Sequence, residues 1–119
     1  MKQYLLLIFI SSLVILTGCE TTQPLYYHGD YNQVLYSYFK GEGQSLSEQI
    51  SKLNTLIDRA KAKSKPVAPG VYAHLGYLHM QAGNKNEGLK NFELEKAYFP
   101  ESEGYINFLM ANMRGNKNE

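Results

Sequence analysis

The sequence predicts an all-α protein in which two helical hairpins and a C-terminal capping helix form one domain over residues 30–114. Three observations lead to this fold class. Apolar residues recur at intervals of three and four along several segments, which is the spacing of one face of a helix. Glycine or proline separates these segments, and both residues end helices. Finally, residues 31–40 resemble residues 72–81 at an offset of 41, so the chain contains a diverged internal repeat.

The first 18 residues have the composition of a secretory signal peptide. Lys2 precedes an apolar stretch that is too short for a comfortable membrane span. The stretch ends in Leu16-Thr17-Gly18-Cys19, which resembles the bacterial lipobox. This resemblance implies cleavage before Cys19 and lipidation of its thiol, with a plain signal peptide or an uncleaved anchor as the alternatives. Cys19 is the only cysteine, so no internal disulfide can form.

Glu20 bears on the location of the lipidated protein. Lipoproteins of this kind carry several acyl chains, and anchoring by more than one chain is stable. In enterobacteria-like sorting, an aspartate after the lipidated cysteine retains the protein in the inner membrane, and this chain has Glu20 there. We therefore expect a lipid-anchored protein at the periplasmic face of the outer membrane, with the inner membrane as the alternative. Residues 19–29 are expected to form a short lipidated tether that packs Leu25, Tyr26 or Tyr27 against the domain.

The first hairpin is predicted from two amphipathic segments. Asp30 with Gln33 forms a candidate capping box for the first helix, which Gly41 ends, and Ser45 with Glu48 forms a second box. The apolar positions of the two helices fall at helical spacing: Tyr31, Val34, Leu35 and Tyr38, then Leu46, Ile50, Leu53, Ile57 and Ala60. Three lysines cluster at the end of the second helix: Lys61, Lys63 and Lys65. We interpret them as a solvated helix end in preference to a lipid or anion site.

The second hairpin resembles the tetratricopeptide (TPR) repeat, whose pattern runs from an aromatic residue through Leu-Gly to Ala-x3-Phe and a closing Pro. Five positions are in register: Tyr72, Leu75, Gly76, Phe92 and Pro100. His79 replaces an aromatic residue, and Gly88 replaces an alanine. Gly83 separates the two helices, and Asn84 with Glu87 is expected to cap the second one. The apolar faces are expected to comprise Val71, Leu75, Leu78 and Ala82, and then Leu89, Phe92 and Phe99. An ordinary helical hairpin with these residues as core is the alternative.

A last helix after Pro100 is expected to cover the second hairpin, because a repeat cannot bury its apolar face alone. Ser102 is its candidate cap. Its apolar face is expected to comprise Ile106, Leu109, Met110 and Met113. Residues 115–119 are expected to form a disordered polar tail.

Charge and motif content argue against several function classes. Without Lys2, eleven basic residues balance eleven acidic ones, so the mature chain offers no basic stripe for nucleic acid. The histidines lack the i, i+4 spacing of a zinc site, and no phosphate-binding or dinucleotide-binding motif occurs. Glu93 and Glu95 point to different faces of a helix, so we expect solvated or capping residues rather than an acid/base pair. We therefore expect no enzyme, no cofactor, no metal and no nucleic-acid partner.

The first helices of TPR hairpins line a concave surface that faces the ligand. Carried over to this chain, that surface comprises Asn32, Tyr36, Phe39 and Lys40 from the first hairpin and Ala73, Tyr77, Met80 and Gln81 from the second. Tyrosines and a methionine beside amide groups suit an extended peptide or a partner helix. The candidate partner-binding residues are therefore Tyr36, Phe39, Tyr77, Met80 and Gln81. Alternatively, the tether or the last helix fills this groove, and these residues are simply core.

The whole mature chain resembles a family of small proteobacterial lipoproteins catalogued as a domain of unknown function. The resemblance extends over residues 19–113 and rests on the segments LYYHGDY, PGVYAHLG and FELEKAYFPES. Tyr26 stands where members commonly have Trp. Members are usually encoded beside a CsgG-like lipoprotein and a third lipoprotein, which implies an adaptor role in an envelope assembly with CsgG-like partners. The alternatives are a structural envelope lipoprotein without a specific ligand, and an enzyme subunit.

Overall fold

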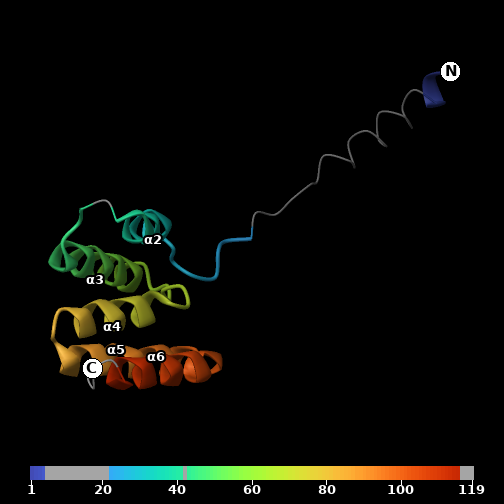
Figure 1. Cartoon of the computed structure of the whole chain (residues 1–119). Helices are drawn as coiled ribbons and strands as arrows, with labels where there is room; N and C mark the ends of the chain where they lie inside the picture. The colour runs from blue at the N-terminus through green and yellow to red at the C-terminus, as the bar shows by residue number, and fades with distance from the viewer. Residues whose placement is uncertain (5–21, 42, 116–119) are drawn as a thin grey trace.

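The computed structural model describes residues 1–4, 22–41 and 43–115, and helices dominate it (Figure 1). Its elements are α2 (Tyr31–Lys40), α3 (Leu46–Ala62), α4 (Val71–Gln81), α5 (Lys85–Tyr98), the 3-10 turn η1 (Pro100–Ser102) and α6 (Glu103–Gly115). Within the described residues there is no β-strand, only an isolated parallel bridge between Tyr27 and Val67. The predicted all-α fold class is therefore confirmed. Cys19, nearly all of the predicted signal peptide and the tail after residue 115 lie outside the described residues.

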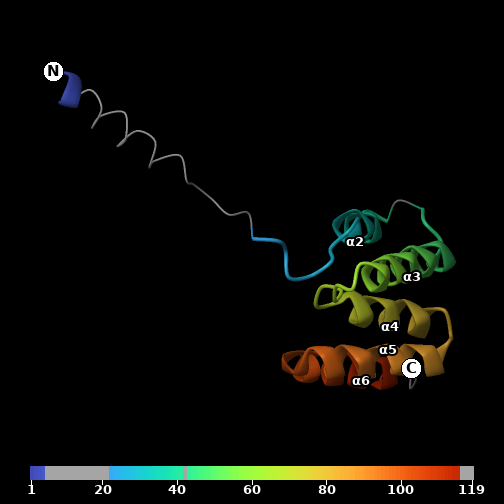
Figure 2. The same ribbon diagram turned by 180° about the vertical axis from the view of Figure 1, so that it is seen from behind.

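The helices stack side by side in chain order, as Figures 1 and 2 show from opposite sides. α2 with α3 forms the first hairpin, α4 with α5 forms the second, and α6 lies on the second hairpin. The segment that leads into α2, the α3–α4 connection and the α5–α6 turn all lie at one end of the stack. We call this the tether end, and the end that carries the α4–α5 turn the far end.

Two glycines let α4 and α5 approach closely. A Cβ atom on Gly76 would lie 2.7 Å from Cδ1 of Phe92 and 3.0 Å from the carbonyl oxygen of Gly88. A Cβ atom on Gly88 would lie 2.6 Å from the side chain of Met80. Phe92 fills the contact and is fully buried. Gly88 departs from the TPR pattern, but like Gly76 on the opposite helix it leaves room for α4 and α5 to pack closely.

One apolar core joins the two hairpins, since α3 faces α4. It contains most of the residues predicted to be apolar on α2, α3 and α4: Val34, Leu53, Ile57, Ala60, Val71, Leu75 and Leu78. Leu56 is also fully buried, although it lay outside the predicted stripe. The predictions for Ala82 and Leu89 are wrong, because Ala82 lies past the end of α4 and Leu89 is 40% exposed. Leu89 points away because the face of α5 turned inwards is centred on Gly88, Asn91, Phe92 and Glu95.

A side chain from α5 caps the N-terminus of α4. Gly70 occupies the N-cap position with φ +94°, a conformation that favours glycine, and it has no side chain to cap the helix. Glu95 is only 1% exposed and supplies the cap. Its Oε1 accepts a hydrogen bond from the Gly70 N–H at 2.7 Å, and its Oε2 accepts one from the Ala73 N–H at 3.2 Å. Burial raises the pKa of Glu95, while the backbone hydrogen bonds oppose that rise.

Other predicted caps have mixed outcomes. The Oγ of Ser45 accepts a hydrogen bond from the Glu48 N–H at 3.2 Å, as predicted for α3. Asp30 and Asn84 occupy the N-cap positions of α2 and α5, but neither side chain caps its helix. Both residues depart from the extended backbone conformation that brings a capping oxygen onto the first turn. The Ser102 prediction is also wrong, because the Oγ of Ser102 has no hydrogen-bond partner among the described residues.

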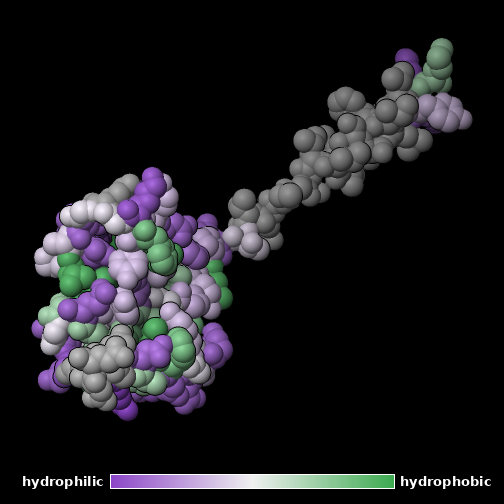
Figure 3. Space-filling model, viewed as in Figure 1, coloured by the Kyte–Doolittle hydropathy of each residue, from purple (hydrophilic) through white to green (hydrophobic). Residues whose placement is uncertain are grey.

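The last helix covers the second hairpin as predicted. Ile106 is fully buried in a small cluster with Phe92 and Ala73. The other predicted apolar residues of α6 pack partly buried around this cluster: Leu109, Met110 and Met113. Figure 3 shows hydrophilic residues over much of the visible surface, with hydrophobic residues in small separate patches.

Candidate functional site

A groove runs across α4 between α2 and α6. It consists of two cavities of about 500 and about 400 Å³, and Tyr77 and Leu109 line both of them. The larger, at the far end, is lined by Tyr77, Met80, Gln81, Lys85, Leu109, Asn112 and Met113. The smaller, toward the tether end, is lined by Tyr31, Leu35, Tyr38, Phe39, Gly70, Ala73, His74, Tyr77, Tyr105 and Leu109. We call them the far cavity and the aromatic cavity, and their union the groove.

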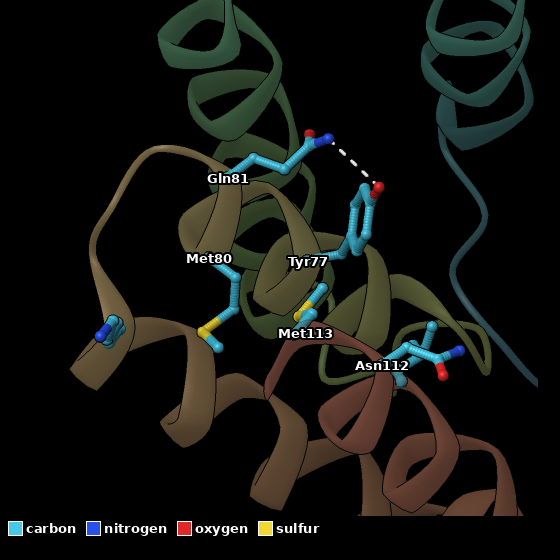
Figure 4. Close-up of a pocket in the computed structure, with 7 residues that line it drawn as sticks. Tyr77, Met80, Gln81, Asn112 and Met113 are labelled. Atoms are coloured by element: carbon cyan, nitrogen blue, oxygen red, sulfur yellow. Dashed lines mark hydrogen bonds between the residues drawn. The ribbon is translucent and has the colours of Figure 1, made fainter. Parts of the chain in front are cut away.

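The far cavity combines amide groups with methionines. Figure 4 shows Tyr77, Met80 and Gln81 projecting from α4 beside Asn112 and Met113 of α6. The Nε2 of Gln81 donates a hydrogen bond to the Tyr77 hydroxyl at 3.2 Å, which fixes both side chains at the cavity wall. Unbranched methionine side chains adapt to different surfaces, so this cavity can accommodate apolar groups of varied shape.

The aromatic cavity is built around Tyr38 of α2. Its ring lies edge-on to His74, with ring centroids 5.0 Å apart, and edge-on to Tyr77 at 6.4 Å. Burial and a hydrogen bond with Tyr77 raise the pKa of Tyr38 to about 12, so its phenol stays protonated at neutral pH. Tyr105 and Phe39 stand at the rim, 59% and 76% exposed. Rigid aromatic side chains of this kind provide large contact areas at low cost in side-chain entropy.

His74 lines the aromatic cavity and contains two buried ring nitrogens without a hydrogen-bond partner among the described residues. Burial lowers the pKa of His74, so the imidazole is neutral at pH 7. A neutral imidazole carries one donor and one acceptor, and in His74 both nitrogens are buried, so neither is exposed to the cavity.

The charge of the groove is set by one residue. Lys85, at the start of α5, lines the far cavity, and no described aspartate or glutamate lines either cavity. The groove therefore favours a segment that is neutral or carries an acidic group near the far end. Within the described part of the chain, no group of three or more His, Cys, Asp or Glu side chains could hold a metal ion.

Comparison with known proteins identifies the family but no activity. The model of the family described as a domain of unknown function, DUF4810, matches residues 25–109. The chain belongs to the DUF4810 family. No curated protein and no solved structure matches it. The DUF4810 match begins at the segment that precedes α2 and ends inside α6, so it includes nearly all of the groove.

The structure brings together four of the five candidate partner-binding residues in this DUF4810 protein. Tyr77, Met80 and Gln81 line the far cavity, and Phe39 lines the aromatic cavity. Tyr36 lines neither cavity; it is 56% exposed, and the Nζ of Lys40 lies 4.8 Å from its ring centroid. Tyr77 and Met80 also pack partly buried against the cluster of Ala73, Phe92 and Ile106, as the core alternative predicts. The last helix forms one wall of both cavities, and the tether packs elsewhere.

Sequence reasoning missed the contributions of Tyr38, His74 and α6 to the groove. Tyr38 fell on the predicted core stripe of α2, and His74 fell between the core and groove positions of α4. A signal for α6 was present, since Leu109 and Met113 follow Leu75 and His79 at an offset of 34, the length of a TPR repeat. At this offset α6 aligns with α4, and both helices line the groove.

None of the helices in the described part of the chain combines the length and the apolar character that a membrane-spanning helix needs.

Proposed function

We propose that this DUF4810 protein is a lipid-anchored adaptor of the bacterial cell envelope that holds a segment of a partner protein in the groove. The observation that carries the proposal is the groove itself, in which three helices contribute aromatic rings, methionines and amides around two cavities that share Tyr77 and Leu109. Interfaces are enriched in tyrosine, methionine and phenylalanine at their centres and depleted in acidic residues, which matches this lining.

The anchor and the location belong to the same proposal. The lipobox-like sequence before Cys19 supports lipidation of that residue, and Glu20 after it supports the periplasmic face of the outer membrane. The resemblance to lipoproteins encoded beside CsgG-like proteins supports partners of that kind. The proposal assigns no catalysis to the groove.

Site-specific photocrosslinking in intact cells tests the groove directly. A photoreactive phenylalanine analogue in place of Tyr77 should crosslink to a CsgG-like lipoprotein. The same analogue in place of Tyr36 is the matched control, because Tyr36 is an exposed tyrosine that lines neither cavity. Equal crosslinking from both positions, or none from Tyr77, would contradict the groove as the binding site.

Affinity measurements complete the test. Tyr77→Ala should weaken recovery of the partner from detergent-solubilised membranes by at least about fivefold, the effect of losing roughly 1 kcal/mol at an interface anchor. Tyr36→Ala should leave recovery unchanged. Thermal melts of both variants show whether a loss of recovery merely follows a loss of folded protein. Recovery of bulk envelope components alone by the wild type would instead support a structural lipoprotein without a specific ligand.

A further inference from the structure

The segment before α2 is fixed to the tether end of the stack. The Tyr27 N–H donates a hydrogen bond to the Pro66 carbonyl oxygen at 2.7 Å, within the parallel bridge to Val67. The ring of Tyr26 lies edge-on to Phe99, with centroids 5.9 Å apart. This part of the chain is therefore docked onto the α3–α4 connection and the end of α5, and is not a free linker.

Three lysines surround the docked segment. The Nζ of Lys63 lies 4.9 Å from the ring centroid of Tyr27, and the Nζ of Lys65 lies 3.5 Å from the carbonyl oxygen of Pro24. Lys61 and Lys65 line a small cavity of about 120 Å³ together with Tyr98. None of the three lysines forms an ion pair with a carboxylate that the structure describes. No described carboxylate therefore neutralises their charges.

Exposed apolar and aromatic groups lie among these charges. Leu25 is 73% exposed although it directly precedes the docked Tyr26, and Tyr98 is 60% exposed. Tyrosine and lysine are the side chains that membrane proteins place at the headgroup level, where an apolar stem and a polar tip are both satisfied. An adjacent leucine can reach the acyl boundary. The combination fits a lipid surface better than it fits water.

The length of the chain before Pro24 limits how far from a membrane this surface can lie. Cys19 is five residues before Pro24, whose carbonyl oxygen makes the first contact of the docked segment. An extended chain spans at most about 3.6 Å per residue, so the two residues are within about 18 Å of each other. An acylated Cys19 would therefore hold the tether end against the bilayer.

We propose that Leu25, Tyr98 and the lysines Lys61, Lys63 and Lys65 form a membrane-resting surface that binds the anionic headgroups of a phospholipid bilayer. The inference rests on the proposed lipidation of Cys19. The docked segment then orients the whole domain: the tether end faces the bilayer, and the α4–α5 turn faces away from it. The aromatic cavity lies near the membrane, and the far cavity opens at a distance from it.

Depth-dependent quenching on vesicles tests this orientation. Acylated Cys19 has no free thiol, so a second cysteine introduced into the lipoprotein accepts a fluorescent label selectively. Labels at Lys61→Cys and at Asn86→Cys compare the tether end with the far end, since Asn86 is exposed near the start of α5. With vesicles that contain anionic phospholipid and a quencher in the headgroup region, we expect at least about twofold stronger quenching at position 61.

Two variants separate the parts of the proposal. Lys63→Gln with Lys65→Gln should reduce the difference between the labels by at least half, whereas Lys52→Gln with Lys90→Gln removes the same charge elsewhere and should leave it unchanged. Tyr26→Ala should also reduce the difference in quenching between the two labels, because the ring contact with Phe99 is lost.

The outcomes distinguish the anchor from the orientation. If the lipoprotein does not remain with the vesicles, the anchor proposed at Cys19 fails. If it remains bound but both labels are quenched equally, or if the two lysine pairs have the same effect, the membrane-resting surface is overturned while the anchor stands. Stronger quenching at position 61 that only the Lys63 and Lys65 changes diminish supports the surface.

Discussion

Replacing Glu95 tests the contact by which α5 caps the N-terminus of α4. Its carboxylate accepts hydrogen bonds from the Gly70 and Ala73 N–H groups, and its side chain is 1% exposed. Glu95→Ala leaves both N–H groups without their acceptor, and each unsatisfied buried donor costs about 1–3 kcal/mol. We therefore expect a loss of about 2–6 kcal/mol in the free energy of unfolding. A domain of this size has a total stability of about 5–15 kcal/mol, so the variant should be close to unfolding.

Glu95→Gln refines the test, because glutamine retains one oxygen. Its amide nitrogen would face one of the two N–H donors, so one hydrogen bond is lost and the expected cost falls to about 1–3 kcal/mol. Glu93→Gln is the matched control on the same helix. Glu93 is exposed and pairs with Lys96 at 2.8 Å, and surface pairs contribute at most about 1 kcal/mol. Urea unfolding followed by helical circular dichroism measures all three variants.

The pH dependence of the Glu95→Gln effect provides an independent check. Burial raises the pKa of Glu95 above its ordinary value of 4.5, so the folded state holds this proton to a higher pH than the unfolded state does. The stabilisation due to Glu95 is therefore complete below the unfolded pKa and declines as the pH rises through the folded pKa. Because glutamine does not titrate, the stability of the wild type should fall more steeply than that of Glu95→Gln as the pH rises from 4 towards neutrality. A steeper fall in the variant would contradict the raised pKa, and equal effects of the Glu95 and Glu93 changes would refute the buried cap.

Further expectations concern packing, ionisation and anchoring. Leu75→Ala should cost about 2–5 kcal/mol in the urea titration, because Leu75 is 2% exposed in the main core; an unchanged midpoint would contradict this. Gly76→Ala should cost about 1–3 kcal/mol because its new Cβ meets the buried ring of Phe92, whereas Gly88→Ala meets a flexible methionine and should cost less; the reverse order would count against the close contact of α4 and α5. Burial raises the pKa of Tyr31 to about 12, so stability should fall as the pH rises from 10 to 12, and less so in Tyr31→Phe; identical alkaline profiles would disprove this. Cys19→Ser should release the protein from membranes washed with high salt, and continued sedimentation would place the anchor elsewhere.

Periodic spacing predicted the helices well because each helix is a local structure. The buried positions of α3 and α4 follow from apolar residues three and four apart, and the contact between Gly76 and Phe92 follows from the repeat spacing. The role of Glu95 could not be predicted in this way. Its partners are 25 and 22 residues away along the chain, and only the close packing of α5 on α4 brings them together.

The groove was predicted less completely, and α2 shows why. Equating α2 with α4 assigned Tyr36 to the groove, whereas the structure leaves Tyr36 56% exposed. Tyr38, predicted as core, packs partly buried against the main core and also lines the groove beside His74. Alignment of the two segments assumes that both helices have the same rotation about their axes. The first hairpin has a longer loop than the second and has Leu35 where the second has Gly76, so it lacks the close contact that fixes the rotation of α4.

The docking of the tether also determines how the domain bears tension. In the proposed adaptor, the membrane anchor and the bound partner hold the protein at two points and pull it between them. Force applied at the N-terminus first loads the hydrogen bond from Tyr27 to Pro66 and the contact of Tyr26 with Phe99, before it reaches α2. The force is therefore transmitted to the domain at the α3–α4 connection, between the two hairpins. α2, which forms one wall of the groove, is therefore not the first element to bear the load.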